Sequence, residues 1–183
     1  MRTFMRRAVA GVAAVAIVGS PVALLSASVA GASTTSASAT AHVTVIARKW
    51  PVVRPGARGQ RVVAIQYLLR AHRFYVSVDG QYGRITTKAV IRFQRSRGLV
   101  RDGIVGPATW SRLIVAVRKG NRGNAVLALQ HSLRYGYGYR ISVDGVFGSQ
   151  TRAAVILFQI RFRLRADGIV GPVTWRYLMA NER

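Results

Sequence analysis

The sequence predicts an all-α protein: two tandem small three-helix bundles behind an N-terminal signal peptide and a flexible tether. Apolar residues recur at helical spacing, and two loop segments, 78–83 and 102–110, occur again as 143–148 and 167–175. In both copies, the aspartate of the second loop comes 23 positions after the aspartate of the first. Self-similarity at a fixed period is the signature of a duplicated module.

Residues 1–30 have the three-part layout of a secretory signal peptide. Three arginines in the first seven residues precede an apolar run from 8 to 25, and the small residues Ser28 and Ala30 mark a cleavage point. A membrane anchor is the alternative, but Gly-Ser-Pro at 19–21 interrupts the run, which is shorter than the roughly 20 strongly apolar residues of a spanning helix. We therefore expect secretion without a stable membrane span after cleavage.

Residues 31–49 follow as a flexible tether and lead-in. The part up to residue 41 is almost entirely Gly, Ala, Ser and Thr, which cannot bury a core. Trp50 and Pro51 end an extended stretch, and we expect Trp50 to pack on the first module. The two modules are predicted at 50–116 and 117–180.

Each copy contains three helical segments. In the first copy, apolar residues follow a period of 3.6 in the stretches 62–69, 89–93 and 107–113, the last opened by Pro107. The second copy aligns with an offset of 64 residues up to its first helix and 65 afterwards, which places one extra residue in the loop 135–139. Because a module of about 60 residues is marginally stable, four large rings should supply much of the core: Phe93, Trp110, Phe158 and Trp175.

Four of the five acidic residues precede a glycine in the repeated loops: Asp79, Asp102, Asp144 and Asp167. An Asp-Gly pair favours an Asx-turn, and negative charge before a helix is stabilised by free N–H groups. We expect these aspartates to shape the loops and cap the helices. Paired-carboxylate catalysis is an alternative, but it would exist twice in modules too small for a deep cleft. Calcium binding is another, but the required ligand spacing is missing.

The composition bears on which catalytic sites, metal sites and partners are possible. The chain has no cysteine, so it has no disulfide, thiolate nucleophile or cysteine metal site. His42, His72 and His131 do not occupy equivalent positions in the copies, and we predict no metal and no cofactor. The 28 Lys and Arg against 5 Asp and Glu favour an anionic partner: nucleic acid, anionic lipid or anionic cell wall.

A string of residues at fixed spacing runs through the first copy, and most of it recurs in the second: Gly56, Gly59, Gln66, Val78-Asp79-Gly80, Phe93-Gln94, Gly98-Leu99, Asp102-Gly103 and Thr109-Trp110. This string closely resembles the peptidoglycan-binding-like domain, type 1, of bacterial cell-wall proteins, and the resemblance covers about residues 50–180. It implies a three-helix bundle that usually accompanies a wall hydrolase, amidase or transpeptidase and holds it on peptidoglycan.

The resemblance implies an exported protein that binds the cell wall, here with two modules. Because five acidic residues, three histidines and no cysteine provide no recognisable catalytic constellation, we expect it to be non-catalytic. Peptidoglycan is the expected partner, and anionic wall polymers and a wall hydrolase are further candidates. One alternative is an accessory or activator of a wall hydrolase. Another is a basic nucleic-acid-binding protein, which the signal peptide disfavours, so no specific nucleic-acid partner is expected.

The candidate binding residues are polar, basic or aromatic positions that the fold does not obviously need: Gln66, Arg70, Tyr82, Arg84, Gln130, Arg134, Tyr137 and Phe147. Arginine matches carboxylates with two hydrogen bonds, and the tyrosines of 135–139 could stack on sugar rings. Each has a structural alternative: a solvated surface for the arginines, a helix-to-loop hydrogen bond for the glutamines, core packing for Tyr82 and Phe147, and an ordinary loop for 135–139.

The second copy departs from the first where α-helical surface should be polar. Ile160 and Phe162 stand where the first copy has arginine, and Arg163 replaces Gly98. We expect this apolar face to meet the other module. Because the connection between the copies is short, we also expect the two modules to form a fixed pair.

Overall fold

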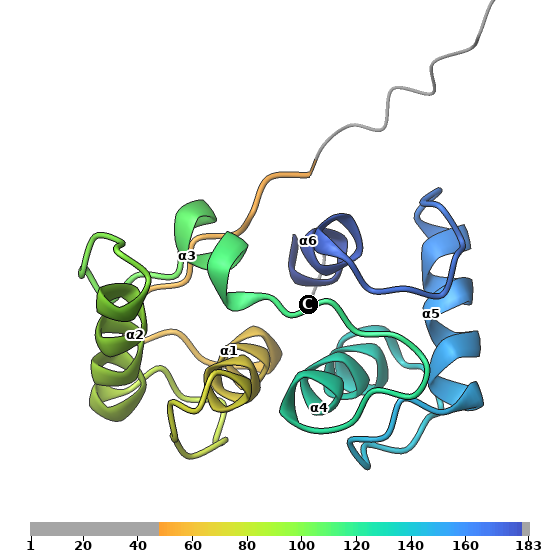
Figure 1. The fold of residues 1–183 in the computed structure, drawn as a ribbon, viewed down its shortest axis with the longest axis horizontal. Helices are drawn as coiled ribbons and strands as arrows, with labels where there is room; N and C mark the ends of the chain where they lie inside the picture. The colour runs from red at the N-terminus through yellow and green to blue at the C-terminus, as the bar shows by residue number, and fades with distance from the viewer. Residues whose placement is uncertain (1–47, 181–183) are drawn as a thin grey trace, which may run out of the picture. The chain divides into compact units, whose positions relative to one another are not determined.

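The computed structural model describes residues 48–180. The predicted signal peptide, 1–30, and nearly all of the tether and lead-in, 31–49, lie outside these residues. The first copy contains α1 (Gln60–Ala71), α2 (Arg84–Ser96) and α3 (Pro107–Leu113) (Figure 1). The second contains α4 (Asn124–His131), continued by the π-helical turn η1 (Ser132–Gly136), then α5 (Ser149–Arg161) and α6 (Pro172–Ala180). The all-α prediction is confirmed.

Isolated antiparallel bridges tie the loops of each copy in the same way. Val53 pairs with Val105 in the first copy, and Val117 pairs with Val170 in the second. A second bridge joins Arg58 to Gln81, and its counterpart lies at 122 and 146. These bridges hold the segment before the first helix against both repeated loops, so each copy closes on itself.

The four predicted rings are fully buried in the two copies. Trp110 Nε1 donates a hydrogen bond of 2.8 Å to the carbonyl of Pro51, and Trp175 Nε1 donates one of 2.8 Å to the carbonyl of Val115. Trp50 stacks on Trp110 with 5.5 Å between ring centroids. The lead-in therefore packs on the first module, as predicted.

The extra residue of the second copy is taken up mainly by a helix rather than by a loop. The turn η1 (Ser132–Gly136) widens the end of the first helix of this copy, where α1 of the first copy is regular. A π-helical turn accommodates one additional residue within a helix. The sequence alignment placed the extra residue at 135–139, which overlaps only the end of η1.

The two copies meet through α1 and α4. Helix α1 packs against α4 and η1, and its buried residues surround most of the helix. Arg61 Nε donates a hydrogen bond of 2.8 Å to the carbonyl of Met179. The rings of Tyr67 and His131 lie 6.1 Å apart. Helix α1 is therefore buried on two sides, against its own copy and against the second copy. This explains why its apolar residues do not form a single stripe.

The expected contact through the apolar residues of α5 was wrong. Ile160 is 58% exposed, and Phe162 packs within its own copy, 4.6 Å from the ring of Phe158. The other module lies against α4, so Ile160 remains on the surface. Within residues 48–180, no helix is long and apolar enough to cross a membrane.

Candidate functional site

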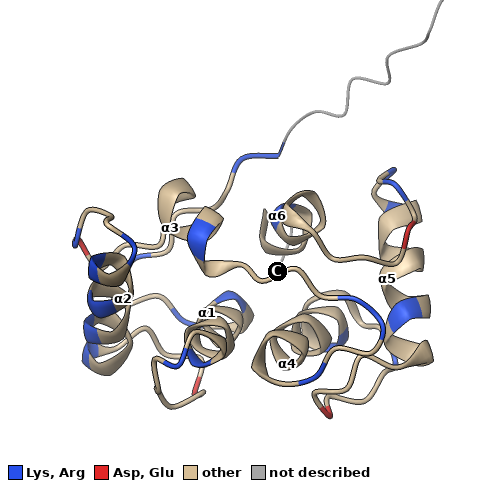
Figure 2. Ribbon diagram, in the orientation of Figure 1, with Lys and Arg blue, Asp and Glu red and all other residues tan. Residues whose placement is uncertain are grey.

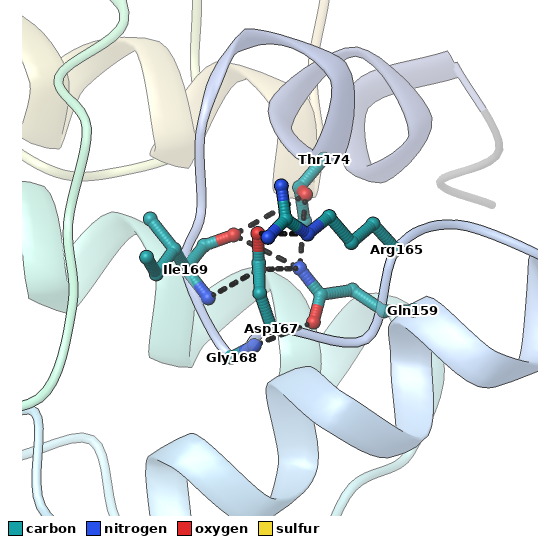
Figure 3. A network of polar contacts seen from close by, with 6 residues as sticks. All are labelled: Gln159, Arg165, Asp167, Gly168, Ile169 and Thr174. Carbon is teal, nitrogen blue, oxygen red and sulfur yellow. Dashed lines mark hydrogen bonds and ion pairs between the residues drawn. The ribbon is translucent and has the colours of Figure 1, made fainter.

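A buried glutamine holds each of the four Asp-Gly loops, and Figure 3 shows the last of them. Gln159 Nε2 donates to Asp167 Oδ1 at 3.0 Å, to the Ile169 carbonyl at 2.9 Å and to Thr174 Oγ1 at 3.3 Å. Its Oε1 accepts from the Gly168 N–H at 2.9 Å. One amide thus joins the second helix of the copy, the loop and the helix that follows.

The same arrangement occurs three more times. Gln66, Gln94 and Gln130 donate to the aspartates of their loops at 2.7, 2.8 and 2.8 Å. Each also donates to a threonine seven residues after that aspartate. We call these four groups the glutamine clamps. Their shared sequence, Asp-Gly-x-x-Gly-x-x-Thr, starts at 79, 102, 144 and 167, and this fourfold motif was missed because the loops were matched between copies but not within one.

The aspartates form the predicted Asx-turns but do not cap the helices. Oδ1 of each accepts the N–H two residues later, at 2.8 to 2.9 Å. The residues before α2, α3 and α5 are Gly83, Gly106 and Gly148, and no side chain caps these helices. The predicted capping was therefore wrong, because the aspartates lie too far ahead of the first helical turn.

The hydrogen bond from the backbone N–H is the main cause that lowers the pKa of each of these carboxyls, and the clamp glutamine lowers it further. Arg165 Nε lies 3.9 Å from Asp167 Oδ2 (Figure 3), the only ion pair within residues 48–180. A carboxylate stabilised in its charged form is a poor proton donor. The geometry supports a structural role for these aspartates rather than general acid catalysis.

The structure buries four of the predicted binding residues. Gln66 and Gln130 are clamp residues, and Tyr82 and Phe147 lie in the cores of their copies. The Tyr82 hydroxyl donates to the Gly103 carbonyl at 2.8 Å, and burial raises its pKa. Side chains with at most 1% exposure have no surface to offer a wall polymer, so the structural alternative holds for all four.

Tyr137 also has a packing role. Its hydroxyl lies 2.6 Å from the carbonyl oxygen of Leu178, and its ring meets Phe158 edge-on at 4.9 Å. In the first copy, His72 occupies the corresponding place: its Nε2 lies 2.9 Å from the carbonyl oxygen of Leu113, and its ring is 5.1 Å from Phe93. Tyr137 therefore fastens α6 to the core, as His72 fastens α3.

The remaining arginines occupy different environments. Arg84 is exposed at the start of α2. Arg70 is half-buried, and its Nε is buried without a hydrogen-bond partner in the structure. Arg134 is exposed, donates to the Ile141 carbonyl at 2.9 Å and lies over the ring of Tyr135 at 5.5 Å. Arg134 also lines a groove.

That groove lies on the second copy, next to η1, and has a volume of about 650 Å³. Two arginines, two tyrosines and four smaller residues line it: Arg134, Tyr135, Gly138, Tyr139, Arg140, Ile141, Ser142 and Gln150. Burial raises the pKa of Tyr139, so its hydroxyl stays protonated at neutral pH. We call this the tyrosine–arginine groove, and its cations and rings suit a ligand with both carboxylate and sugar groups.

Sequence reasoning identified Arg134 and the tyrosine segment but missed Arg140 and Gln150. A signal was present, because the first copy has Tyr75 and Ile85 at the corresponding positions. Arg140 and Gln150 are therefore specific to the second copy, a difference that the sequence already contains. The first copy instead has a smaller, mainly apolar groove of about 440 Å³ beside α3, lined in part by Leu99, Val100, Ile104 and Pro107.

The His and Asp side chains of the described region, which are the residue types that could bind a metal, lie apart from one another. Within residues 48–180, no group of three His, Asp or Glu side chains is arranged to hold a metal ion.

Comparison with known proteins places these modules in a family. The family model described as "Putative peptidoglycan binding domain" matches twice, at residues 58–113 and 122–178. The chain belongs to this family. Both matches fall within the predicted modules, and the tandem arrangement expected from the sequence is confirmed.

Several relatives of the chain are named as amidases. It is 30% identical over 176 residues to a "Probable N-acetylmuramoyl-L-alanine amidase" of Bacillus licheniformis, with 80% of this chain and 50% of the relative covered. It is 43% identical over 103 residues to the N-acetylmuramoyl-L-alanine amidase CwlM of Mycobacterium tuberculosis, with 50% of this chain and 25% of the relative covered. The chain thus spans half or less of the length of these relatives.

A solved structure of a peptidoglycan-binding protein from Clostridioides difficile is 45% identical to the matched part. The match covers 36% of this chain and 41% of the chain in that structure, with a TM-score of 0.35.

Proposed function

We propose that the chain is an exported protein that binds peptidoglycan with two tandem modules and that residues 48–180 do not catalyse a reaction. The observation that carries the proposal is the match of both copies to the peptidoglycan-binding family. The clamps support the non-catalytic part, because the four aspartates of this region all serve as loop supports. Two weak sites on one polymer gain affinity through avidity.

The tyrosine–arginine groove is the proposed contact on the second copy. Peptidoglycan combines sugar rings with stem peptides that carry carboxylates. Arg140 is exposed at the groove, and Tyr135 is 54% exposed. An arginine beside exposed rings provides both a carboxylate partner and a stacking surface.

Co-sedimentation with purified insoluble peptidoglycan tests the proposal. Wild-type protein should pellet at physiological salt, and Tyr135→Ala with Arg140→Ala should weaken binding about tenfold or more because two contacts are lost. The matched control, Tyr75→Ala with Lys119→Ala, removes one exposed tyrosine and one cation away from the groove and should bind like wild type. Wild-type protein that stays in the supernatant would refute the proposed function.

A turbidity assay addresses the hydrolase alternative. A suspension of intact walls should keep its optical density when the protein is added alone. A steady loss of turbidity, absent in a heat-denatured sample, would mean that the chain itself cleaves the wall.

A further inference from the structure

The exposed face of the second helix differs sharply between the two copies. In α2 this face carries four cations at positions i, i+4, i+8 and i+11: Arg84, Lys88, Arg92 and Arg95, all exposed. The corresponding positions of α5 carry no charge: Ser149, Ala153, Leu157 and Ile160. We call the four cations the α2 stripe, and Figure 2 shows blue bands recurring along this helix. Since α5 folds without such charges, the module does not need them for its structure.

The α2 stripe is unfavourable for the stability of its own helix. Like charges four residues apart destabilise a helix by about 0.2–0.5 kcal/mol per pair, and the stripe contains two such pairs. Arg84 also lies in the first turn, where the helix dipole disfavours a cation, and this turn has no acidic residue. A charged face that costs stability and is absent from the sister helix indicates a use outside the fold.

Within the part of the chain that the structure describes, no stripe cation forms an ion pair with an acidic side chain. The only ion pair within residues 48–180 joins Arg165 to Asp167, in the second copy. Arg97, at the end of α2, points instead to His72, with 3.0 Å between Nη2 and Nδ1. The four stripe cations are therefore free to bind an external anion.

We propose that the α2 stripe binds a phosphodiester-linked anionic polymer of the cell wall. This inference rests on the proposed function, which places the protein at the wall. The rise of 1.5 Å per residue spreads the four cations over about 16 Å along one side of the helix. A linear row of this kind matches a chain of repeated phosphates better than a single small anion, and arginine is the preferred partner of phosphate.

The chemistry of the helix disfavours an anionic membrane surface and single-stranded nucleic acid. A membrane-surface helix inserts its apolar face, but Ala89, Val90 and Phe93 of α2 are buried in the module core. Single-stranded nucleic-acid sites combine cations with aromatic residues on which bases stack, and the stripe contains no aromatic residue. A wall polymer without bases or acyl chains needs only the cations.

Binding to two wall preparations tests the proposal. One preparation retains its phosphodiester polymer, and in the other this polymer has been removed by acid extraction. The stripe variant is R84A/K88A/R92A/R95A of the full chain. The control variant, R101A/R112A/K119A/R122A, removes the same net charge from other exposed positions.

On phosphate-bearing walls, the stripe variant should bind at least about tenfold more weakly than wild type, with a smaller salt dependence. The control variant should stay within about twofold of wild type. A third variant, R84K/R92K/R95K, keeps the charges and should retain most of the binding. Equal weakening of the stripe and control variants would overturn the proposal, because net charge alone would then explain the effect.

The extracted walls separate this inference from the proposed function. There, wild type and the stripe variant should bind equally, through the peptidoglycan contact. If wild type fails to bind extracted walls, the proposed function fails, whatever the stripe does. If the stripe variant loses affinity for a duplex DNA oligonucleotide or anionic vesicles but keeps wild-type affinity for phosphate-bearing walls, the wall-polymer assignment is wrong.

Discussion

Single residues organise this protein through the four glutamine clamps. Each clamp glutamine is at most 1% exposed, yet its amide nitrogen and oxygen both form hydrogen bonds to the groups that the clamp joins. Buried polar groups are tolerated when their hydrogen bonds are satisfied. A small module has few core residues against which a loop can pack. In each clamp, the hydrogen bonds of one amide hold the loop in place instead.

Gln66→Ala should destabilise the protein by about 2–4 kcal/mol, because the N–H groups of Asp79 and Gly80 lose their acceptor and the loop loses its link to α1. Urea unfolding measures the effect as a lower midpoint. Gln81→Ala is the control, since that exposed side chain belongs to no clamp, and it should change stability by less than about 0.5 kcal/mol. An unchanged midpoint for Gln66→Ala would contradict the clamp role.

The clamp aspartates predict a loss of stability in acid. Each has a pKa below its ordinary value of 3.8 in the folded protein. Their contribution to stability is therefore fully present above about pH 3.8, and it is lost as the pH falls through the lowered pKa values of the folded protein. The cause is that the unfolded chain binds protons at a higher pH than the folded chain does. Replacing all four aspartates by Asn keeps a side-chain oxygen that can accept the hydrogen bonds and removes the titratable carboxyl group.

The melting temperature of the wild type should fall steeply below about pH 4, whereas the melting temperature of the four-Asn variant should vary less over the same range. Thermal scans between neutral and acidic pH measure both curves. Parallel curves would show that other groups control the acid response.

At the scale of elements, the two copies reach the same helix geometry with different residues. Arg163 ends α5 with φ of 54°, in the left-handed region where Gly98 ends α2 with φ of 65°. Losing the glycine therefore did not change the backbone but placed an arginine in a conformation that costs a non-glycine residue energy. The turn η1 is a similar adjustment, since it absorbs an extra residue without moving Tyr137 from the core.

Exchanging the residues at these helix ends should move stability in opposite directions. Arg163→Gly should stabilise the protein by about 0.5–1 kcal/mol, and Gly98→Arg should destabilise it by a similar amount. No atom lies within 4 Å of a Cβ at Gly98, so the backbone conformation and not a clash is the cause. Chemical denaturation of both variants tests this, and shifts of the same sign would refute it.

At the scale of the whole molecule, α1 and α4 make one body from two modules. Arg176 lies over the ring of Trp50 at 5.6 Å, which adds a second link beside the α1–α4 contact. Each small module gains buried surface from the other, and small domains benefit most from such burial. This arrangement supports the expectation of a fixed pair.

Nitrogen-15 relaxation should give one rotational correlation time for both modules of the wild type. Arg61→Ala with Tyr67→Ala removes the hydrogen bond to Met179 and the ring pair with His131, so the modules should tumble more independently. Arg58→Ala with Tyr75→Ala, at exposed positions of the first copy, should leave the correlation time unchanged. Two different correlation times in the wild type would refute the fixed pair.

Prediction from sequence succeeded where the signal was local and repeated. Periodic apolar residues located the helices, and Asp-Gly pairs located the Asx-turns. The candidate site was harder, because a buried glutamine and a ligand-binding glutamine look alike in sequence. Gln66 and Gln130 donate to aspartates 13 and 14 residues away, and only the folded structure shows that both glutamines are buried and hydrogen-bonded to these loops.

The sequence by itself determined the helix content, the duplication and the family, because each of these depends on residues at fixed short spacings. Tertiary structure decided which faces remain free. It buried Tyr82 and Phe147, joined the copies through α1 and α4 rather than through Ile160, and assembled a groove from Arg134, Tyr139 and Arg140. The burial of Tyr82 and Phe147 and the contact between α1 and α4 depend on packing between distant segments, where burial and not residue type decides whether a side chain supports the fold or faces a ligand.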